Sequence, residues 1–184
     1  MNSTIENNVT ISCVSFNMHG FTQGIHELTS LTDRSTSIIF LQEVWLSEAA
    51  SLEKFDCFCE NYDLFYFSAI EAKLSQGILR GRPHGGLAIL IHKNFSKYFT
   101  KVELLIANEN FILLRLDKFC IGTVYFPCIK KSAGLALLQS LLDNLRSNLA
   151  MAIFSFCIIG GDINCNIKVP NKNAKIIQRQ ICYQ

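Results

Sequence analysis

Short, unbroken apolar runs recur along this chain and alternate with segments that carry apolar residues at helical spacing. A strand that is covered on both faces needs apolar residues at every position, so such runs are typical of buried strands. The run at 86–91 predicts a strand, and three other runs predict buried strands, at residues 11–16, 37–41 and 153–159. The last of these is expected to stop at Gly160-Gly161. Strands that have no solvent-exposed face and alternate with helices predict a layered α/β fold.

Shorter patterns complete the sheet prediction. Residues 64–67 favour another strand because they are apolar and aromatic. Three further runs, at 102–107, 111–116 and 120–125, are separated by short polar breaks. That spacing predicts an antiparallel meander.

Helical spacing appears in three places. Residues 24–33 carry apolar side chains at that spacing, and Ser47 is expected to cap a short helix that runs through Lys54. The longest helix is expected to open at Ser132, because leucines then recur on one stripe. These leucines are Leu135, Leu138, Leu142, Leu145 and Leu149.

The composition favours a packed core. Hydrophobic residues make up 49% of the chain and charged residues 17%, against ~25% charged in a typical domain. The net charge of +2 excludes a polybasic arm or an acidic tail, so affinity for nucleic acid is expected in a local patch. The longest apolar stretch, residues 149–159, is well short of the ~20 residues that span a bilayer. The N-terminus lacks a basic segment followed by an apolar one, which predicts an intracellular protein without a membrane partner.

The eight cysteines are expected to be reduced, because disulfides are rare in an intracellular compartment. Cys13, Cys120 and Cys157 lie inside apolar runs and are expected to behave as small buried hydrophobes.

Polar side chains stand where several of the predicted strands end. In layered α/β proteins, ligands bind beyond the carboxyl ends of strands, so these side chains are expected to meet at one site. Two carboxylates with amide and phenol groups form an oxygen-rich set that suits Mg²⁺. The residues concerned are Asn17, Glu43, Tyr125, Asp162 and Asn164. His19, two residues past Asn17, is close enough in sequence to approach this site, but a lone histidine in a loop is usually solvated, and that is the expectation here.

Four motifs carry a resemblance to a known family. FN (residues 16–17), LQE (41–43), YFP (125–127) and GDIN (161–164) occur in the order found in the endonuclease/exonuclease/phosphatase superfamily. That superfamily includes apurinic endonucleases, enzymes similar to deoxyribonuclease I and the endonuclease domains of non-LTR (LINE) retrotransposons. The loop GRPHGG at residues 81–86, which leads into LAILIH, is especially similar to the retrotransposon branch.

The resemblance implies a fold and a chemistry. The fold is a four-layer α/β sandwich similar to deoxyribonuclease I, with two packed mixed β-sheets flanked by helices and an incomplete second sheet. The chemistry is phosphodiester hydrolysis that depends on a divalent metal, Mg²⁺ or Mn²⁺. Glu43 is then the principal metal ligand, and Asn17 belongs to the same metal site. Gln42 is expected to contact a ligand and not the metal itself.

The resemblance assigns the remaining site residues by motif. Asp162 orients or deprotonates the attacking water. Asn164 and Tyr125 bind the scissile phosphate and stabilise its transition state. Arg82 and His84, in the loop before the run at 86–91, are the expected contacts to the DNA backbone or to a groove.

One departure from the family is visible. The family closes with a Ser-Asp-His motif, whereas no histidine follows His92 here and Asp162 is the last aspartate. The resemblance therefore covers residues 11–167 as a partial, C-terminally truncated domain. Residues 1–10 are expected to be a disordered N-terminus and residues 168–184 an irregular basic tail.

Three functions stay open at this point. The first is a DNA endonuclease that nicks DNA for a retrotransposon, acts in the nucleus and needs no obligate protein partner. The second is a non-catalytic relic of the same fold, because an essential histidine is missing. The third is a phosphatase or a phosphoesterase similar to sphingomyelinase.

Overall fold

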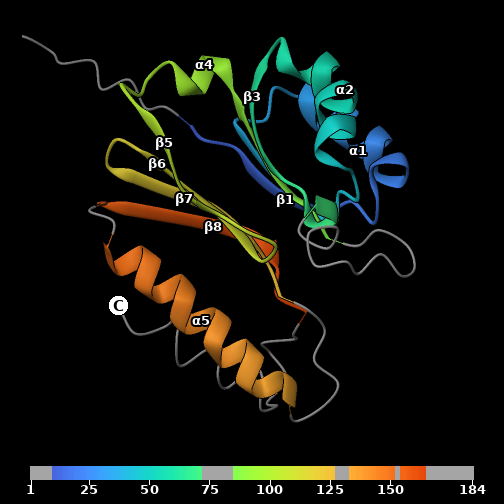
Figure 1. Cartoon of the computed structure of the whole chain (residues 1–184). Coiled ribbons are helices and arrows are strands. Elements are labelled where there is room, and N and C mark those ends of the chain that lie inside the picture. The colour runs from blue at the N-terminus through green and yellow to red at the C-terminus, as the bar shows by residue number, and fades with distance from the viewer. Residues whose placement is uncertain (1–9, 72–84, 127–132, 152–153, 165–184) are drawn as a thin grey trace, which may run out of the picture.

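Two mixed β-sheets pack face to face and are flanked by helices in the computed structural model (Figure 1). The structure describes residues 10–71, 85–126, 133–151 and 154–164. The predicted α/β sandwich of two mixed sheets with flanking helices is confirmed. No helix in these described ranges is both long and apolar enough to cross a membrane.

The first sheet has the order β1-β2-β4-β3. Its strands are β1 (Cys13–Asn17), β2 (Ile38–Gln42), β3 (Tyr62–Phe67) and β4 (Leu87–His92). β1 runs parallel to β2, and β4 is antiparallel to both of its neighbours. Because successive side chains of a strand point to opposite faces, Ile39 and Leu41 of β2 face the helices while Ile38 and Phe40 face the second sheet.

Helices α1 (Phe21–Asp33) and α2 (Glu48–Cys59) cover the outer face of this sheet. The predicted cap at Ser47 is confirmed, since its side chain accepts a hydrogen bond from the Ala50 backbone N–H. The helix that it opens continues beyond Lys54 to Cys59 because Phe55 and Phe58 anchor it on the sheet. The short helix α4 (Lys93–Ser96) follows β4.

The second sheet has the order β5-β6-β7-β8. Its strands are β5 (Val102–Ala107), β6 (Phe111–Leu116), β7 (Phe119–Tyr125) and β8 (Phe156–Asp162). The predicted meander is confirmed, because β5, β6 and β7 pair antiparallel in sequence order, while β8 joins parallel to β7. Helix α5 (Ala133–Met151) covers the outer face, where Leu138, Leu142 and Leu145 pack on β6 and β7.

The predicted burial of two strands is wrong. In β8, Phe156 is 63% exposed and Ile159 38% exposed, and the strand continues through both glycines to Asp162. In the described part of the chain β8 pairs with β7 alone, and the buried cluster beneath α5 is built on β6 and β7. β1 is half-buried for the same reason, since it is the edge strand of the other sheet. The apolar composition of a run therefore did not distinguish an edge strand from a central strand of the sheet.

The cysteines follow this pattern. Cys120 lies on the inner strand β7 and is buried as expected, whereas Cys13 on β1 and Cys157 on β8 are exposed. The expectation that all three are buried is wrong for the two edge-strand residues. All cysteines in the described ranges are free thiols.

A buried polar contact joins the two sheets below the strand ends. Gln42, the last residue of β2, is 1% exposed. Its Nε2 donates to the Thr123 hydroxyl of β7 at 2.8 Å and lies 3.3 Å from the Ser15 hydroxyl of β1. A buried polar group is costly unless it is hydrogen-bonded, so these contacts fix how the two sheets meet.

We expect this contact to be measurable as coupling between the two sheets. Gln42→Met keeps most of the volume but leaves the Thr123 hydroxyl without its amide partner, and Thr123→Val does the converse. Each substitution is expected to lower the free energy of unfolding by about 1–3 kcal/mol. The double variant should cost less than the sum, as measured by urea denaturation. Additive costs would show that the contact contributes nothing to stability.

Candidate active site

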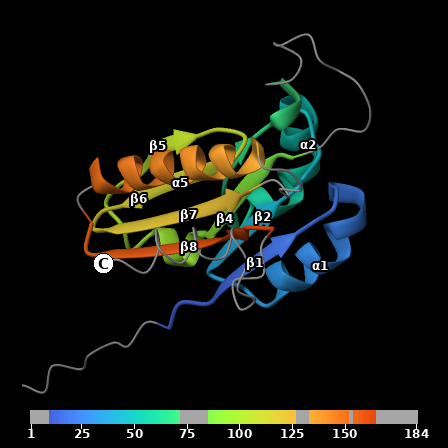
Figure 2. The ribbon, with the colours of Figure 1, turned by 90° about the horizontal axis from the view of Figure 1, so that it is seen from below.

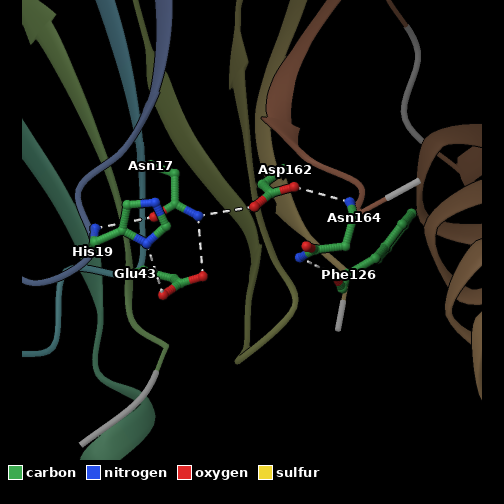
Figure 3. A network of polar contacts seen from close by, with 6 residues as sticks. All are labelled: Asn17, His19, Glu43, Phe126, Asp162 and Asn164. Carbon is green, nitrogen blue, oxygen red and sulfur yellow. Dashed lines mark hydrogen bonds and ion pairs between the residues drawn. The ribbon is translucent and has the colours of Figure 1, made fainter. Parts of the chain in front are cut away.

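Polar residues from both sheets meet at the carboxyl ends of β1, β2 and β8 (Figure 3). Asn17 is the last residue of β1, Glu43 directly follows β2, and Asp162 is the last residue of β8. The parallel pairs β1–β2 and β7–β8 bring these ends together, and β1 lies beside β8 across the sandwich (Figure 2). The structure thus brings three of the expected site residues, Asn17, Glu43 and Asp162, into contact.

The Asn17 side chain lies at the centre of this group. Its Nδ2 donates to Glu43 Oε1 at 3.0 Å and to Asp162 Oδ2 at 2.8 Å. Because ionised carboxylates only accept hydrogen bonds, the amide NH₂ has to face them. One neutral side chain thus holds two carboxylates from different sheets in place.

Two of the strand ends use the same local hydrogen bond. The Asn17 Oδ1 accepts from the His19 backbone N–H at 3.0 Å, and Asp162 Oδ1 accepts from the Asn164 backbone N–H at 2.9 Å. In each case the side chain at the end of a strand holds the backbone two residues further on, which is the usual Asx turn. The Asn164 Nδ2 also donates to the Phe126 carbonyl at 2.9 Å, which ties the end of β8 to the end of β7.

These turns place residues in the left-handed region of backbone space. Positive φ occurs at His19 (50°), Glu43 (53°) and Asn164 (46°). Residues other than glycine adopt it infrequently, and surrounding contacts have to maintain it. Gly20, with φ 99°, donates from its backbone N–H to the Glu43 carbonyl at 2.8 Å and so joins the two loops.

His19 is a site neighbour that the sequence did not assign. Its Nδ1 lies 3.7 Å from Glu43 Oε2, and its side chain is 71% exposed while that of Glu43 is 15% exposed. His19 is thus a solvent-exposed loop residue, as expected, and it also approaches the site. The signal in the sequence was its spacing of two residues from Asn17, followed by a glycine.

Tyr125 ends β7 directly opposite Asp162 in the parallel register. It is half-buried and packs against the core between the sheets, so it belongs to the same strand end. Gln42 lies beneath the group in the buried contact with Thr123. The predicted DNA contacts Arg82 and His84 lie outside the described residues.

The donor set fits a hard divalent ion. Among the described residues there is no group of three or more His, Cys, Asp and Glu side chains close enough to hold a metal. Mg²⁺ is usually bound through one or two carboxylates, with waters and substrate oxygens completing the shell. Both carboxylate oxygens of Asp162 accept hydrogen bonds, one from the Asn17 side chain and one from the Asn164 backbone N–H. Glu43 Oε2, by contrast, faces the exposed His19 ring. Glu43 is thus the more available carboxylate.

Comparison with solved structures shows the class of fold. The chain is similar to an AP endonuclease from Archaeoglobus fulgidus, with a TM-score of 0.67 and 15% sequence identity, over 94% of this chain and 70% of that chain. No protein-family model and no curated protein matches the sequence. At this level of identity the likeness establishes an endonuclease-like fold, similar to deoxyribonuclease I, and nothing finer.

The left-handed turn at Asn164 leads to a stability prediction. Asn164→Ala removes the bond to the Phe126 carbonyl and adds about 1–2 kcal/mol of left-handed backbone strain. Asn164→Gly loses the same bond without that strain. We therefore expect the alanine variant to be the less stable of the two in denaturant unfolding. Equal stabilities would mean that the backbone at residue 164 relaxes freely.

Proposed function

We propose that this chain hydrolyses phosphodiester bonds in DNA with a divalent metal, as the nicking endonuclease of a non-LTR retrotransposon. The observation that supports it best is the Asn17 amide, which holds Glu43 and Asp162 together at the strand ends. The endonuclease-like fold is consistent with this chemistry.

Glu43 is the proposed principal ligand for Mg²⁺ or Mn²⁺. Its Oε1 is fixed by Asn17, and its Oε2 lies 3.7 Å from Nδ1 of the exposed His19 side chain. When bound, the ion neutralises phosphate charge and acts as a Lewis acid. Asn17 keeps the Glu43 carboxylate in one orientation, so little reorganisation is needed when the ion binds.

Asp162 is the proposed residue that orients and deprotonates the attacking water. Hydrogen bonds from Asn17 and Asn164 fix its two oxygens and hence the plane of the carboxylate. A carboxylate held in this way keeps its remaining lone pairs in a constant direction, which is what a general base requires.

Asn164 and Tyr125 are the proposed contacts to the scissile phosphate. The Asn164 amide donates one of its two hydrogens to the Phe126 carbonyl, and an amide NH₂ has a second to offer. The phenol of Tyr125 is a donor from the neighbouring strand end. Donors placed in advance around a phosphate stabilise the charge that develops in the transition state.

The DNA substrate and the retrotransposon role rest on sequence motifs. Arg82 and His84 are proposed to grip DNA, and their loop is the part most similar to retrotransposon endonucleases. With a net charge of +2, binding is expected through a local patch. Action on chromosomal DNA implies a nuclear location, and the AP endonuclease neighbour suggests abasic sites as one substrate to test.

The test is nicking of supercoiled plasmid, intact or partly depurinated, in Mg²⁺ or Mn²⁺. We expect conversion to open circle that EDTA abolishes. Glu43→Gln and Asp162→Asn should each lower the rate by at least ~10²-fold, because each removes a charge used in the reaction. Glu53→Gln, an exposed carboxylate on α2, is the matched control and should leave the rate unchanged.

Two results would contradict the proposal. Folded wild-type protein that nicks neither plasmid would favour the non-catalytic relic. Release of phosphate or phosphocholine from small esters without nicking would favour a phosphatase or sphingomyelinase-like activity.

A further inference from the structure

We propose that the His19 imidazole is a second protein ligand of the divalent ion held by Glu43, so that the site prefers transition-metal ions such as Mn²⁺ over Mg²⁺. This inference rests on the proposed function, because it concerns the metal of the same site. His19 lies in the loop that joins β1 to α1, outside the four family motifs.

The geometry of the two side chains is the first support. The His19 Nδ1 and the Glu43 Oε2 are 3.7 Å apart and point toward each other (Figure 3). Metal–nitrogen and metal–oxygen bonds of about 2.0–2.2 Å keep two ligand atoms of one ion within about 4.3 Å of each other. The two atoms therefore lie within reach of a single ion without moving either loop.

The second support is that hydrogen bonds hold the backbone at His19 and at the residue that follows it. Its backbone N–H is bonded to the Asn17 Oδ1, and the next residue, Gly20, donates to the Glu43 carbonyl. His19 keeps φ at 50°, in the left-handed region, which histidine adopts more often than most residues other than glycine. Because Asn17 contacts both His19 and Glu43, one side chain sets the relative position of the two proposed ligands.

An ion pair between His19 and Glu43 is a weaker explanation of their proximity than a shared metal ion. The His19 side chain is 71% exposed, and solvent screens an ion pair at such a position, so the pair would stabilise the loop little. An exposed imidazole beside a mostly buried carboxylate is, by contrast, an accessible nitrogen–oxygen donor pair for an ion arriving from solvent.

The nitrogen ligand changes the metal preference. Mg²⁺ favours oxygen ligands, whereas an imidazole binds first-row transition ions better. A site made of oxygen donors alone would show a smaller preference for Mn²⁺ than one that includes His19.

The test measures Mn²⁺ binding directly, independent of catalysis. Electron spin-echo envelope modulation of bound Mn²⁺ should show a coordinated imidazole nitrogen in the wild-type chain. His19→Asn should lose this signal, since asparagine tolerates left-handed backbone but has no imidazole. His26→Ala, which removes an exposed histidine on α1, is the control and should keep it.

Affinity provides the second readout. His19→Asn should raise the Mn²⁺ dissociation constant at least about tenfold, as even indirect partners of a metal do when removed. Competition with Mg²⁺ should show that the preference for Mn²⁺ shrinks. Circular dichroism of His19→Asn and His19→Gln would verify that both variants are folded.

The outcomes separate this inference from the proposed function. Wild-type protein that nicks DNA but shows no nitrogen modulation, with unchanged Mn²⁺ affinity in His19→Asn, would overturn the inference alone. Wild-type protein that binds Mn²⁺ through a nitrogen of His19 but nicks no DNA would overturn the proposed function and leave the inference standing.

Discussion

The ring of Phe40 on β2 packs directly on the backbone of β8 at Gly160, and the rest of the structure depends on this close approach. A Cβ added at Gly160 would lie 2.5 Å from a ring carbon of Phe40, so no larger residue fits. Because β8 comes this near to the first sheet, its last residue, Asp162, reaches Asn17 on β1 at 2.8 Å. The contact between the sheets is therefore what brings the two carboxylates into one site.

The polar contacts between the sheets form two levels. Gln42 and Thr123 meet in the buried interior, where an unsatisfied amide or hydroxyl would be costly. Asn17, Glu43 and Asp162 meet at the strand ends, where the site is partly open to solvent. The buried contact between Gln42 and Thr123 fixes how the two sheets pack. The contacts at the strand ends then hold two carboxylates next to an exposed histidine. The proposed metal-assisted hydrolysis would use these fixed carboxylates at the strand ends, which an ion can reach from solvent.

Sequence patterns predicted the secondary structure well where they reflect local physics. Ser47 caps its helix as expected, and the leucines of α5 at 138, 142 and 145 are buried together. The burial of β8 was wrong, because its apolar residues indicate a strand but not its neighbours. Whether Phe156 and Cys157 are covered depends on which strand and helix lie beside them, and a single apolar run carries no information about that.

The sequence by itself determined most of the strands and helices, though not the short helix α4, and placed Asn17, Glu43 and Asp162 at strand ends. Strand period, capping and turn chemistry are local properties, which is why they can be read from it. Only the tertiary structure decided that the Asn17 amide bonds both carboxylates, and that His19 turns toward Glu43. Those contacts join residues up to 145 positions apart in the chain. They depend on the distance between two packed sheets and on left-handed turns, and neither is encoded in the spacing of residues along one strand.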